Sequence, residues 1–424
     1  MSKIRLRLSV GAALLALVFT QASFSQEGRI GAHLEGLLNA AREGNPEFAS
    51  MQFEANAAAE RILPAGALPD PKFSMELRDI TRMGERNPTL LPGRVGSTRY
   101  IFTQELPWFG KRDLKRAAAA LQAEAARGKL AGTWSELVSR IKTTHAQLYY
   151  LEQNERLTRE ILDLMARLEK VAQVRYGSGL AAQQDVIRAQ LEQTTMRNEL
   201  IALDAERSQL QARLKALVGR PASETLATPE SIRTLPAPET MRFDVLEQRA
   251  RSSNPLLRTE ESQIQAAEKN RELTYKNRYP DFAVGVSPIQ YGKSVREWEL
   301  MVEVTIPLQQ DTRRAQEQEA QAMLDAARSR REAATNQVLA DLYENLAGLE
   351  AARRTLALTT DSLLPQSELT FRSALAGYES GKVDFATLLD AQRQIRQAKL
   401  NQVKAGVAAQ MRLADIERIV GEDL

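Results

Sequence analysis

Along four long stretches of the chain, apolar residues recur at alternating spacings of three and four positions. The first stretch, 114–175, holds no proline, and the second, 186–218, places Arg207 at one apolar position. Two more run from about 313 to 362, where Pro365 is expected to end the helix, and from 385 to 420. This spacing is typical of a coiled-coil seam and predicts four long helices. The seam residues of the first three are Leu157, Ile161, Leu164, Leu168, Val171; Leu200, Leu203, Leu210, Leu214, Leu217; and Leu342, Leu346, Leu349, Leu356, Leu363.

Four shorter stretches alternate between polar and apolar residues, which is the period of a strand with one apolar face. In the first of them Phe73, Met75 and Leu77 alternate with polar residues. We predict strands at about 72–79, 97–106, 281–287 and 297–306, joined in pairs by loops over 80–96 and 287–296.

Two segments with similar sequences separate the long helices. Each contains Tyr-x-Ser-Gly and then returns to a helical pattern, at 176–185 (the first tip) and 378–387 (the second tip). Gly179 and Gly381 stand where a helix ends, and glycine is favoured there because it adopts positive φ without a Cβ clash. Each segment is therefore predicted to be the tip of a helical hairpin.

The landmarks of the first half recur in the second half. Asn45-Pro46 is matched by Asn254-Pro255, and Pro107 by Pro307. Residues 26–220 and 241–424 therefore form two copies of one plan: helix, strand, strand, long helix, tip, long helix. A linker rich in Pro, Ser and Thr joins the copies over 221–240.

The N-terminus and the composition limit where the protein acts. Residues 1–25 have the pattern of an export signal, with basic residues before a short apolar run, and no later segment is long and apolar enough for a transmembrane helix. The net charge is +3 with both signs interleaved, and no basic block predicts a nucleic-acid partner. The chain has no cysteine, which excludes disulfides and thiolate metal sites.

The sequence offers no support for catalysis. The two histidines, His33 and His145, stand apart, and we interpret His145 as a surface or seam residue of its helix. No phosphate-binding loop or zinc-ligand spacing is present. We predict no enzyme activity, no cofactor and no resident metal.

Four strands of about ten residues or fewer suit an outer-membrane barrel but cannot close one alone. Three copies would supply about twelve strands and leave no open edge in lipid. The stretch from Pro107 to Tyr176, about 65 residues, would be roughly 90–100 Å long as a helix. The alternatives are an α+β protein with a small sheet and a long coiled coil, or a secreted or periplasmic adaptor or scaffold.

Three segments carry a family resemblance. Gln104-Glu105-Leu106-Pro107-Trp108-Phe109-Gly110-Lys111 resembles the strand-to-helix passage of TolC-type outer-membrane efflux proteins, especially the heavy-metal (CzcC/CusC-like) branch. The two tips resemble that family as well, and the resemblance covers nearly the whole mature chain.

The resemblance implies a mainly α fold with a transmembrane β-barrel part. The family is a homotrimer whose twelve-stranded barrel in the outer-membrane lipid continues into a long helical barrel in the periplasm. The tips face a periplasmic adaptor and an inner-membrane pump, expected to be of the RND type. Substrate passes through the lumen without chemistry, and metal cations are one candidate cargo.

The resemblance also suggests roles for particular residues. Asp185 and Tyr378 match a pair whose bond helps to close the periplasmic mouth in relatives, and Asp390 matches an acidic residue at the entrance. Val383 stands where the best-known relatives carry an arginine, so that link is absent. The residues expected to contact the adaptor are Gly179, Leu180 and Gly381. The alternative interpretation is that the acidic residues are solvated helix positions and that the glycines only cap helices.

Overall fold

The computed structural model describes residues 31–84 and 87–424, so the expected export signal at 1–25 lies outside the described residues. The described chain forms two compact units. The first contains residues 31–49, 134–246 and 341–424, and the second contains 50–133 and 247–340. Each unit therefore takes segments from both halves of the sequence.

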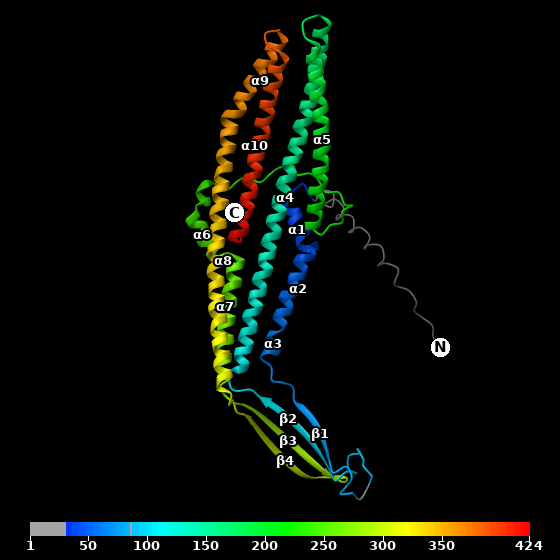
Figure 1. Ribbon diagram of the computed structural model, residues 1–424, viewed down its shortest axis with the longest axis vertical. Coiled ribbons are helices and arrows are strands. Elements are labelled where there is room, and N and C mark those ends of the chain that lie inside the picture. Colours follow the sequence, from blue (N-terminus) through cyan, green and yellow to red (C-terminus); the bar gives the residue numbers. More distant parts are fainter. Residues whose placement is uncertain (1–30, 85–86) are drawn as a thin grey trace, which may run out of the picture. The chain divides into compact units, whose positions relative to one another are not determined.

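The second unit contains one antiparallel sheet in the order β1-β2-β3-β4 (Figure 1). The two halves of the chain meet in this sheet at the pairing of β2 with β3. The strands are β1 (Lys72–Arg78), β2 (Ser97–Leu106), β3 (Asp281–Tyr291) and β4 (Ser294–Thr305).

The prediction of a loop over 287–296 is wrong. β3 continues to Tyr291, and the chain reverses at Gly292 and Lys293, where Gly292 has φ +64°. Pro288, which suggested a loop, lies inside β3 opposite Trp298. The register of β2 with β3 omits residues 287 and 288, so the missing N–H of proline falls at a gap in that ladder.

Helices precede and follow each pair of strands in the second unit. The helix that opens the first copy of the plan is divided at Asn45, whose side chain accepts a hydrogen bond from the Phe48 N–H in the first unit, and again near Arg61. The helices wholly or partly in the second unit are α2 (Pro46–Glu60), α3 (Ile62–Ala65), α4 (Lys111–Gly177), α6 (Phe243–Ser253), α7 (Pro255–Lys276) and α8 (Gln310–Leu358). Lys111 is buried at the start of α4 and pairs with Asp281 at 2.8 Å.

The first unit is helical. The rest of α4 pairs with α5 (Gln183–Leu217), and α9 (Leu364–Glu379) pairs with α10 (Phe385–Val420). The sequence suggested that Pro365 ends the helix that begins at about 313. This prediction is wrong, because the helical residues continue through Pro365. A π-helical turn, Thr359–Leu363, precedes α9 and makes Pro365 part of its first turn, where its missing N–H costs little. The remaining elements are α1 (Leu34–Gly44) and a short 3₁₀ helix, Pro238–Met241.

The buried face of α4 differs slightly from the expected seam. Ile161 and Leu168 are buried as predicted, but Met165 and Ala172 are buried in place of Leu164 and Val171. Ile161, Met165 and Leu168 pack with residues of α5, α9 and α10 in one apolar cluster, and half-buried Leu164 packs against it. Arg207, the odd member of the α5 seam, binds the carboxylate of buried Glu155 at 2.8 Å. A charged residue in the seam is thus explained by a buried partner.

The linker is fixed to the first unit by buried ions. Arg233 of the linker donates two hydrogen bonds to the Glu417 carboxylate, at 2.9 and 3.0 Å. Buried Lys142 of α4 reaches the same carboxylate at 2.8 Å and also pairs with Asp423. No helix within residues 31–84 and 87–424 is long and apolar enough to cross a membrane.

Candidate functional site

The two tips share one backbone motif. In the first tip, the Leu180 N–H donates to the Arg175 carbonyl at 2.8 Å and the Gly179 N–H donates to the Tyr176 carbonyl at 3.0 Å. In the second tip, Lys382 and Gly381 donate to the corresponding carbonyls at 2.8 and 3.1 Å. Gly179 has φ +71° and Gly381 has φ +75°. Both helices therefore end in a Schellman motif, which needs the left-handed residue that glycine provides.

Arg175 connects the tips. Its Nη1 donates to the carbonyl oxygens of Tyr378 at 2.6 Å and Glu379 at 3.1 Å, which lie at the C-terminal end of α9. Its guanidinium carbon also lies 5.0 Å from the centroid of the Tyr378 ring. The cation thus interacts with the negative end of the α9 dipole and with an aromatic face at once.

Tyr378 lies in the apolar cluster of the first unit with only 2% of its surface exposed. Its ring packs edge-on against Phe385, with the centroids 5.3 Å apart. Among the described residues its hydroxyl has no hydrogen-bond partner. Burial raises the pKa of this phenol, and the nearby Asp185 carboxylate raises it further.

Asp185 is half-buried in the first turn of α5. Burial raises the pKa of its carboxyl; Arg188 and Arg175 oppose this rise, and Asp384 adds to it. An uncharged Asp185 would be better matched to this environment than a charged one.

The structure brings Asp185 and Tyr378 into one electrostatic neighbourhood but does not join them directly. Within the described part of a single chain, no hydrogen bond connects the carboxylate with the buried hydroxyl. The gate role of the pair stays a prediction.

Asp390 lies elsewhere on α10. It is exposed and stands 3.9 Å from Arg393 of the same helix, and Arg393 also pairs with Glu192 of α5. No hydrogen bond or ion pair between described residues links Asp390 to Tyr378 or Asp185. Its role at an entrance stays a prediction as well.

The residues expected to contact an adaptor are accessible. Leu180 is 69% exposed, and a Cβ added to Gly179 would meet no atom within 4 Å. A Cβ on Gly381 would meet only the Arg175 Nη2, at 3.1 Å. The tips thus present an exposed leucine beside a backbone surface with few side chains.

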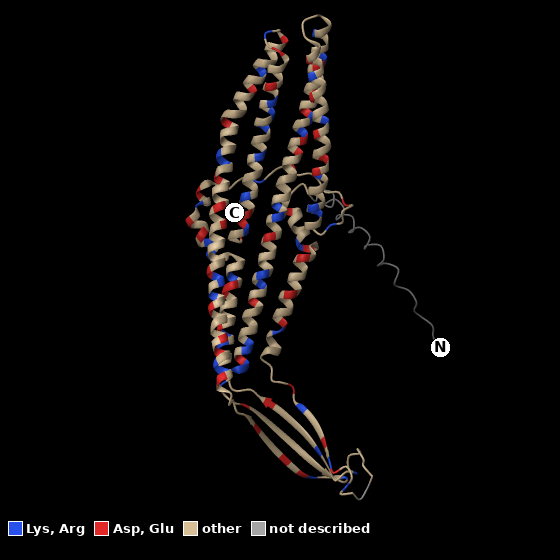
Figure 2. Cartoon of the chain, viewed as in Figure 1, with Lys and Arg blue, Asp and Glu red and all other residues tan. Residues whose placement is uncertain are grey.

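The sheet of the second unit has two different faces. One carries exposed apolar residues, among them Phe73, Trp298, Leu300 and Val302. The other carries charges of both signs, visible along the strands in Figure 2. The charged residues of that face are Lys72, Glu76, Arg78, Arg99, Glu105, Asp281, Glu297, Glu299 and Glu303, and Asp281 is the one that pairs with Lys111 of α4.

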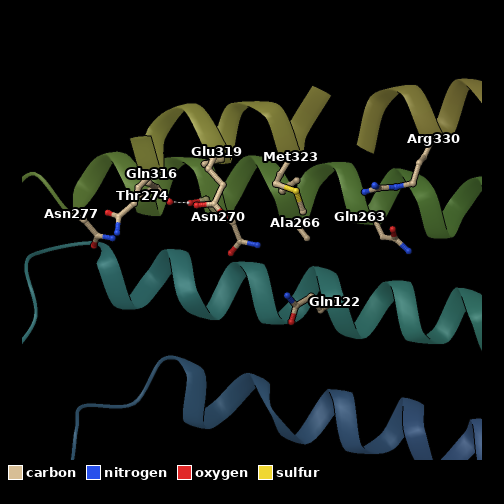
Figure 3. Close-up of a pocket in the computed structure, with 12 residues that line it drawn as sticks. Gln122, Gln263, Ala266, Asn270, Thr274, Asn277, Gln316, Glu319, Met323 and Arg330 are labelled. Atoms are coloured by element: carbon tan, nitrogen blue, oxygen red, sulfur yellow. Dashed lines mark hydrogen bonds between the residues drawn. The ribbon is translucent and has the colours of Figure 1, made fainter. Parts of the chain in front are cut away.

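A cavity of about 550 Å³ with a mixed polar and apolar lining lies among α4, α7 and α8 within the second unit (Figure 3). Amide side chains such as Gln122, Gln263 and Asn270 line it, together with Glu319 and Arg330. Amides and a mixed pair of charges offer weak, exchangeable contacts. Among the described residues no cluster of three or more His, Cys, Asp or Glu could hold a metal ion.

Sequence reasoning missed Arg175. Its position, one residue before the repeated tyrosine of the first tip, was the available signal. In the second tip the corresponding residue is Gly377, so the two tips differ at this position by a whole guanidinium group. Val383, which stands where the best-known relatives carry an arginine, packs against the apolar cluster.

Comparisons with known proteins cover most of the chain. The family model described as "Outer membrane efflux protein" matches residues 37–220 and 246–422. The cobalt-zinc-cadmium resistance protein CzcC of Cupriavidus metallidurans is 24% identical over 92% of this chain and 90% of its own.

Solved structures share the fold. The structure of CusC, which covers 92% of both chains, has a TM-score of 0.78 at 15% identity. That of the outer membrane protein VceC from Vibrio cholerae has a TM-score of 0.77 at 17% identity, over 92% of this chain and 96% of VceC.

Proposed function

The chain belongs to the outer membrane efflux protein family, and we propose that it forms the exit duct of a tripartite efflux system. It is an outer membrane efflux channel with a periplasmic extension. In this proposal a homotrimer receives its substrate from an inner-membrane pump of the RND type and a periplasmic adaptor, and releases it to the exterior.

One observation carries the proposal: the sheet has an apolar face, a charged face and two open edges. An exposed row of Phe, Trp, Leu and Val suits lipid, and the charged face suits a water-filled lumen. An open edge in lipid leaves N–H and C=O groups unpaired at several kcal/mol each, so copies of the chain have to close the sheet. Twelve strands from three copies would do so.

The experiment is a gel and a bilayer recording. We expect a trimer band in the outer-membrane fraction that dissociates on heating, and single-channel currents from the purified protein. A monomeric periplasmic protein without channel activity would favour the adaptor or scaffold alternative and contradict the proposal.

We infer further that the lumen favours cations. On the charged face, Lys72 pairs with Glu105, Arg78 with Glu76, and Arg99 with Glu299. Glu297 and Glu303 remain as excess negative charge. Three copies would form two rings of carboxylates, and such rings favour cations.

Divalent metal cations are therefore the substrate class we favour, in line with the name of the relative CzcC. In a potassium chloride gradient, Glu297→Gln with Glu303→Gln should shift the reversal potential toward anions. Glu239→Gln, which lies in the linker, is the matched control. An unchanged potential in the double variant would remove the strands from the account of selectivity.

The tips would form the periplasmic mouth, with Arg175, Tyr378 and Asp185 holding the two hairpins together and Asp390 near the entrance. Gly179, Leu180 and Gly381 would meet the adaptor, because an exposed leucine and a flat backbone surface allow a helical tip to approach closely. Gly179→Trp together with Gly381→Trp should abolish capture of the periplasmic adaptor, while trimer formation is retained. Capture at the original level would argue against contact through the tips.

A further inference from the structure

The sheet ends in two turns on the side away from the helices (Figure 1). One is the loop between β1 and β2, and the other is the turn between β3 and β4. A Cβ added to Gly93 of the loop would lie 2.5 Å from the carbonyl oxygen of Gly292 in the turn, so the two backbones touch. Arg94 and Lys293 directly follow these glycines. Cations from the two halves of the chain are therefore brought together at this end of the sheet.

The loop between β1 and β2 is folded on itself around Asp79. The Asp79 carbonyl accepts the N–H groups of Gly96 at 2.9 Å and Arg82 at 3.1 Å, and its carboxylate accepts the Met83 N–H at 2.7 Å. Asp79, Arg82 and Met83 have φ of 54°, 52° and 58°, a region that residues other than glycine rarely adopt. The negative charge of Asp79 is thus used inside the loop.

Three exposed cations of these turns, Arg94, Lys293 and Arg296, form no ion pair with any described residue. The carboxylate next to Arg296 in the sequence is that of Glu297, which lies on the charged face and accepts the Tyr291 hydroxyl at 3.2 Å. The end of the sheet therefore carries positive charge that the described part of the chain does not neutralise.

A β-bulge places the third cation next to the apolar face. Trp298 lies opposite Pro288 and Val295 lies opposite Gln290, so the apolar face holds both Trp298 and Val295 although they are three residues apart. Arg296 is the extra residue between them. Bulges at the rim of a barrel often redirect a side chain in this way.

Exposed apolar residues surround the cations. In the loop, Leu90 is 73% exposed and Leu91 is 55% exposed. On the apolar face, Trp298 is 71% exposed. A row of cations above an exposed tryptophan is the order in which a protein meets the phosphates and then the acyl chains of a lipid. A soluble anion would use the cations but leave the leucines and the tryptophan in water.

The position of this end in the membrane follows from the helices. α4 follows β2 and α8 follows β4 at the opposite end of the sheet. In an outer membrane channel with a periplasmic extension those helices lie in the periplasm, so the two turns lie at the outer leaflet. The inference rests on the proposed function for this orientation. The lipid of the outer leaflet is lipid A, an acylated sugar that carries phosphate groups.

We propose that these turns form a docking surface for the phosphorylated sugar head of lipid A. Arg94, Lys293 and Arg296 bind the phosphates, since arginine presents a planar pair of donors to phosphate oxygens and lysine a compact charge. Leu90, Leu91 and Trp298 contact the apolar part of the same lipid.

The test measures binding of the full chain in neutral detergent to lipid A held on a hydrophobic sensor surface. Arg94→Gln with Lys293→Gln should lower the apparent affinity by at least about tenfold, because each Lys or Arg near an anionic lipid contributes on the order of a fivefold factor. Lys115→Gln with Arg314→Gln removes the same charge at the helical end of the sheet and should leave the affinity unchanged. Arg296→Gln alone tests the third cation and should lower the affinity less than the first pair.

Three results would overturn the proposal. They are unchanged affinity in Arg94→Gln with Lys293→Gln, an equal loss in both double variants, and equal binding to dephosphorylated lipid A. Inorganic phosphate that displaces the chain as well as soluble lipid A does would show a site for a free anion and would also overturn it. The binding assay does not depend on channel activity. An unsubstituted chain that binds lipid A but gives no channel currents would therefore contradict the proposed function and leave the docking surface in place.

Discussion

The two tips have the same backbone and different environments. Both end in a Schellman motif with a glycine at positive φ, and both contain a tyrosine three residues before that glycine. Tyr176 of the first tip is 48% exposed, whereas Tyr378 of the second is 2% exposed. The two copies of the plan thus share one turn but place its tyrosine in different surroundings.

The difference lies mainly in what surrounds each tyrosine. Arg175 of the first tip covers Tyr378 and binds the carbonyls at the end of α9, but Gly377, its counterpart, has no side chain to do the same for Tyr176. The first tip therefore provides the side chain that joins the tips, and the second provides the carbonyls and the ring that it contacts. The exposed Tyr176 and Leu180 leave the first tip with apolar surface that a partner could cover.

The largest expected effect comes from replacing the two tyrosines by alanine. Tyr378→Ala removes a fully buried ring and should cost about 3–5 kcal/mol of local stability. Tyr176→Ala should cost less than about 0.5 kcal/mol, the usual range for a surface change. Hydrogen exchange of the amides in α9 and α10 measures the cost of Tyr378→Ala, and exchange in α4 and α5 measures that of Tyr176→Ala. Equal losses of protection would remove the asymmetry between the tips.

The next effect concerns Arg175. Arg175→Ala should cost about 2 kcal/mol, typical of hydrogen bonds made by a charged group, and should raise pore conductance by freeing the hairpins from each other. Arg175→Lys should recover only part of the closure, because an ammonium group cannot bind two carbonyls with a planar fork. Arg167→Ala, an exposed position on α4, is the control.

Conductance in Arg175→Ala equal to that of the unchanged protein would show that this contact does not hold the mouth. Tyr378→Phe adds a test of the hydroxyl. If an Asp185 carboxyl binds it in the closed trimer, this variant should raise conductance; if it stays unpartnered, the variant should leave conductance unchanged.

The features that the two tips share, and part of the sheet, could be predicted from the sequence. The glycines, the hairpins and β2 were predicted because each depends on local patterns: a 3–4 spacing, an alternation or a required positive φ. Leu180 beside the first cap is exposed, and its contact with an adaptor stays a prediction. The extension of β3 through Pro288 was missed, because the gap that tolerates proline is a property of the neighbouring strand.

The role of Arg175 was missed for a similar reason. An arginine in the last turn of a helix is ordinary, since it favours the carbonyl end of its own helix. That it binds the carbonyls of another helix about 200 residues away follows only from the packing of the hairpins. The buried Lys142–Glu417–Arg233 group escaped sequence reasoning as well, because its members come from three separate segments.

A smaller effect is expected from pH. Its direction differs between the tips, because the pKa of Asp185 in the first tip is raised and that of Asp384 in the second tip is lowered. The pKa of Asp185 is raised, so the folded tip takes up a proton as pH falls through that pKa, and contact between the hairpins becomes more stable. The charges facing Asp185 are Arg175, Arg188 and Asp384. Conductance should be lower at a pH close to 3.8, the usual value for the carboxyl, than at pH 7, because the raised pKa lies above 3.8.

Asp185→Asn mimics the protonated state, so it should have low conductance at both pH values. The carboxylates on the strands titrate in both proteins, and only the difference between them reports on Asp185. A fall of equal size in the variant would assign the response to other groups.

The smallest effect comes from the helix caps that follow the tips. Asp384 caps α10 by accepting the Thr387 N–H at 2.8 Å, and the hydrogen bonds from Thr387 lower the pKa of its carboxyl. Ala182, its counterpart, gives α5 no side-chain cap. Asp384→Ala should cost about 1 kcal/mol, while Ala182→Asp should add about 0.5–1 kcal/mol to the first tip.

The lowered pKa of Asp384 determines the pH below which its cap no longer stabilises α10, and so the pH below which the two caps no longer differ in stability. The contribution of Asp384 is complete above 3.8, the usual value for the carboxyl, and is lost as pH falls through the lower folded value. Hydrogen exchange in the first turns of α5 and α10 measures each cap separately. Because Ala182→Asp adds a carboxylate close to Asp185, a gain smaller than the loss in Asp384→Ala is expected. Destabilisation of α5 by Ala182→Asp would show that repulsion outweighs capping in the first tip.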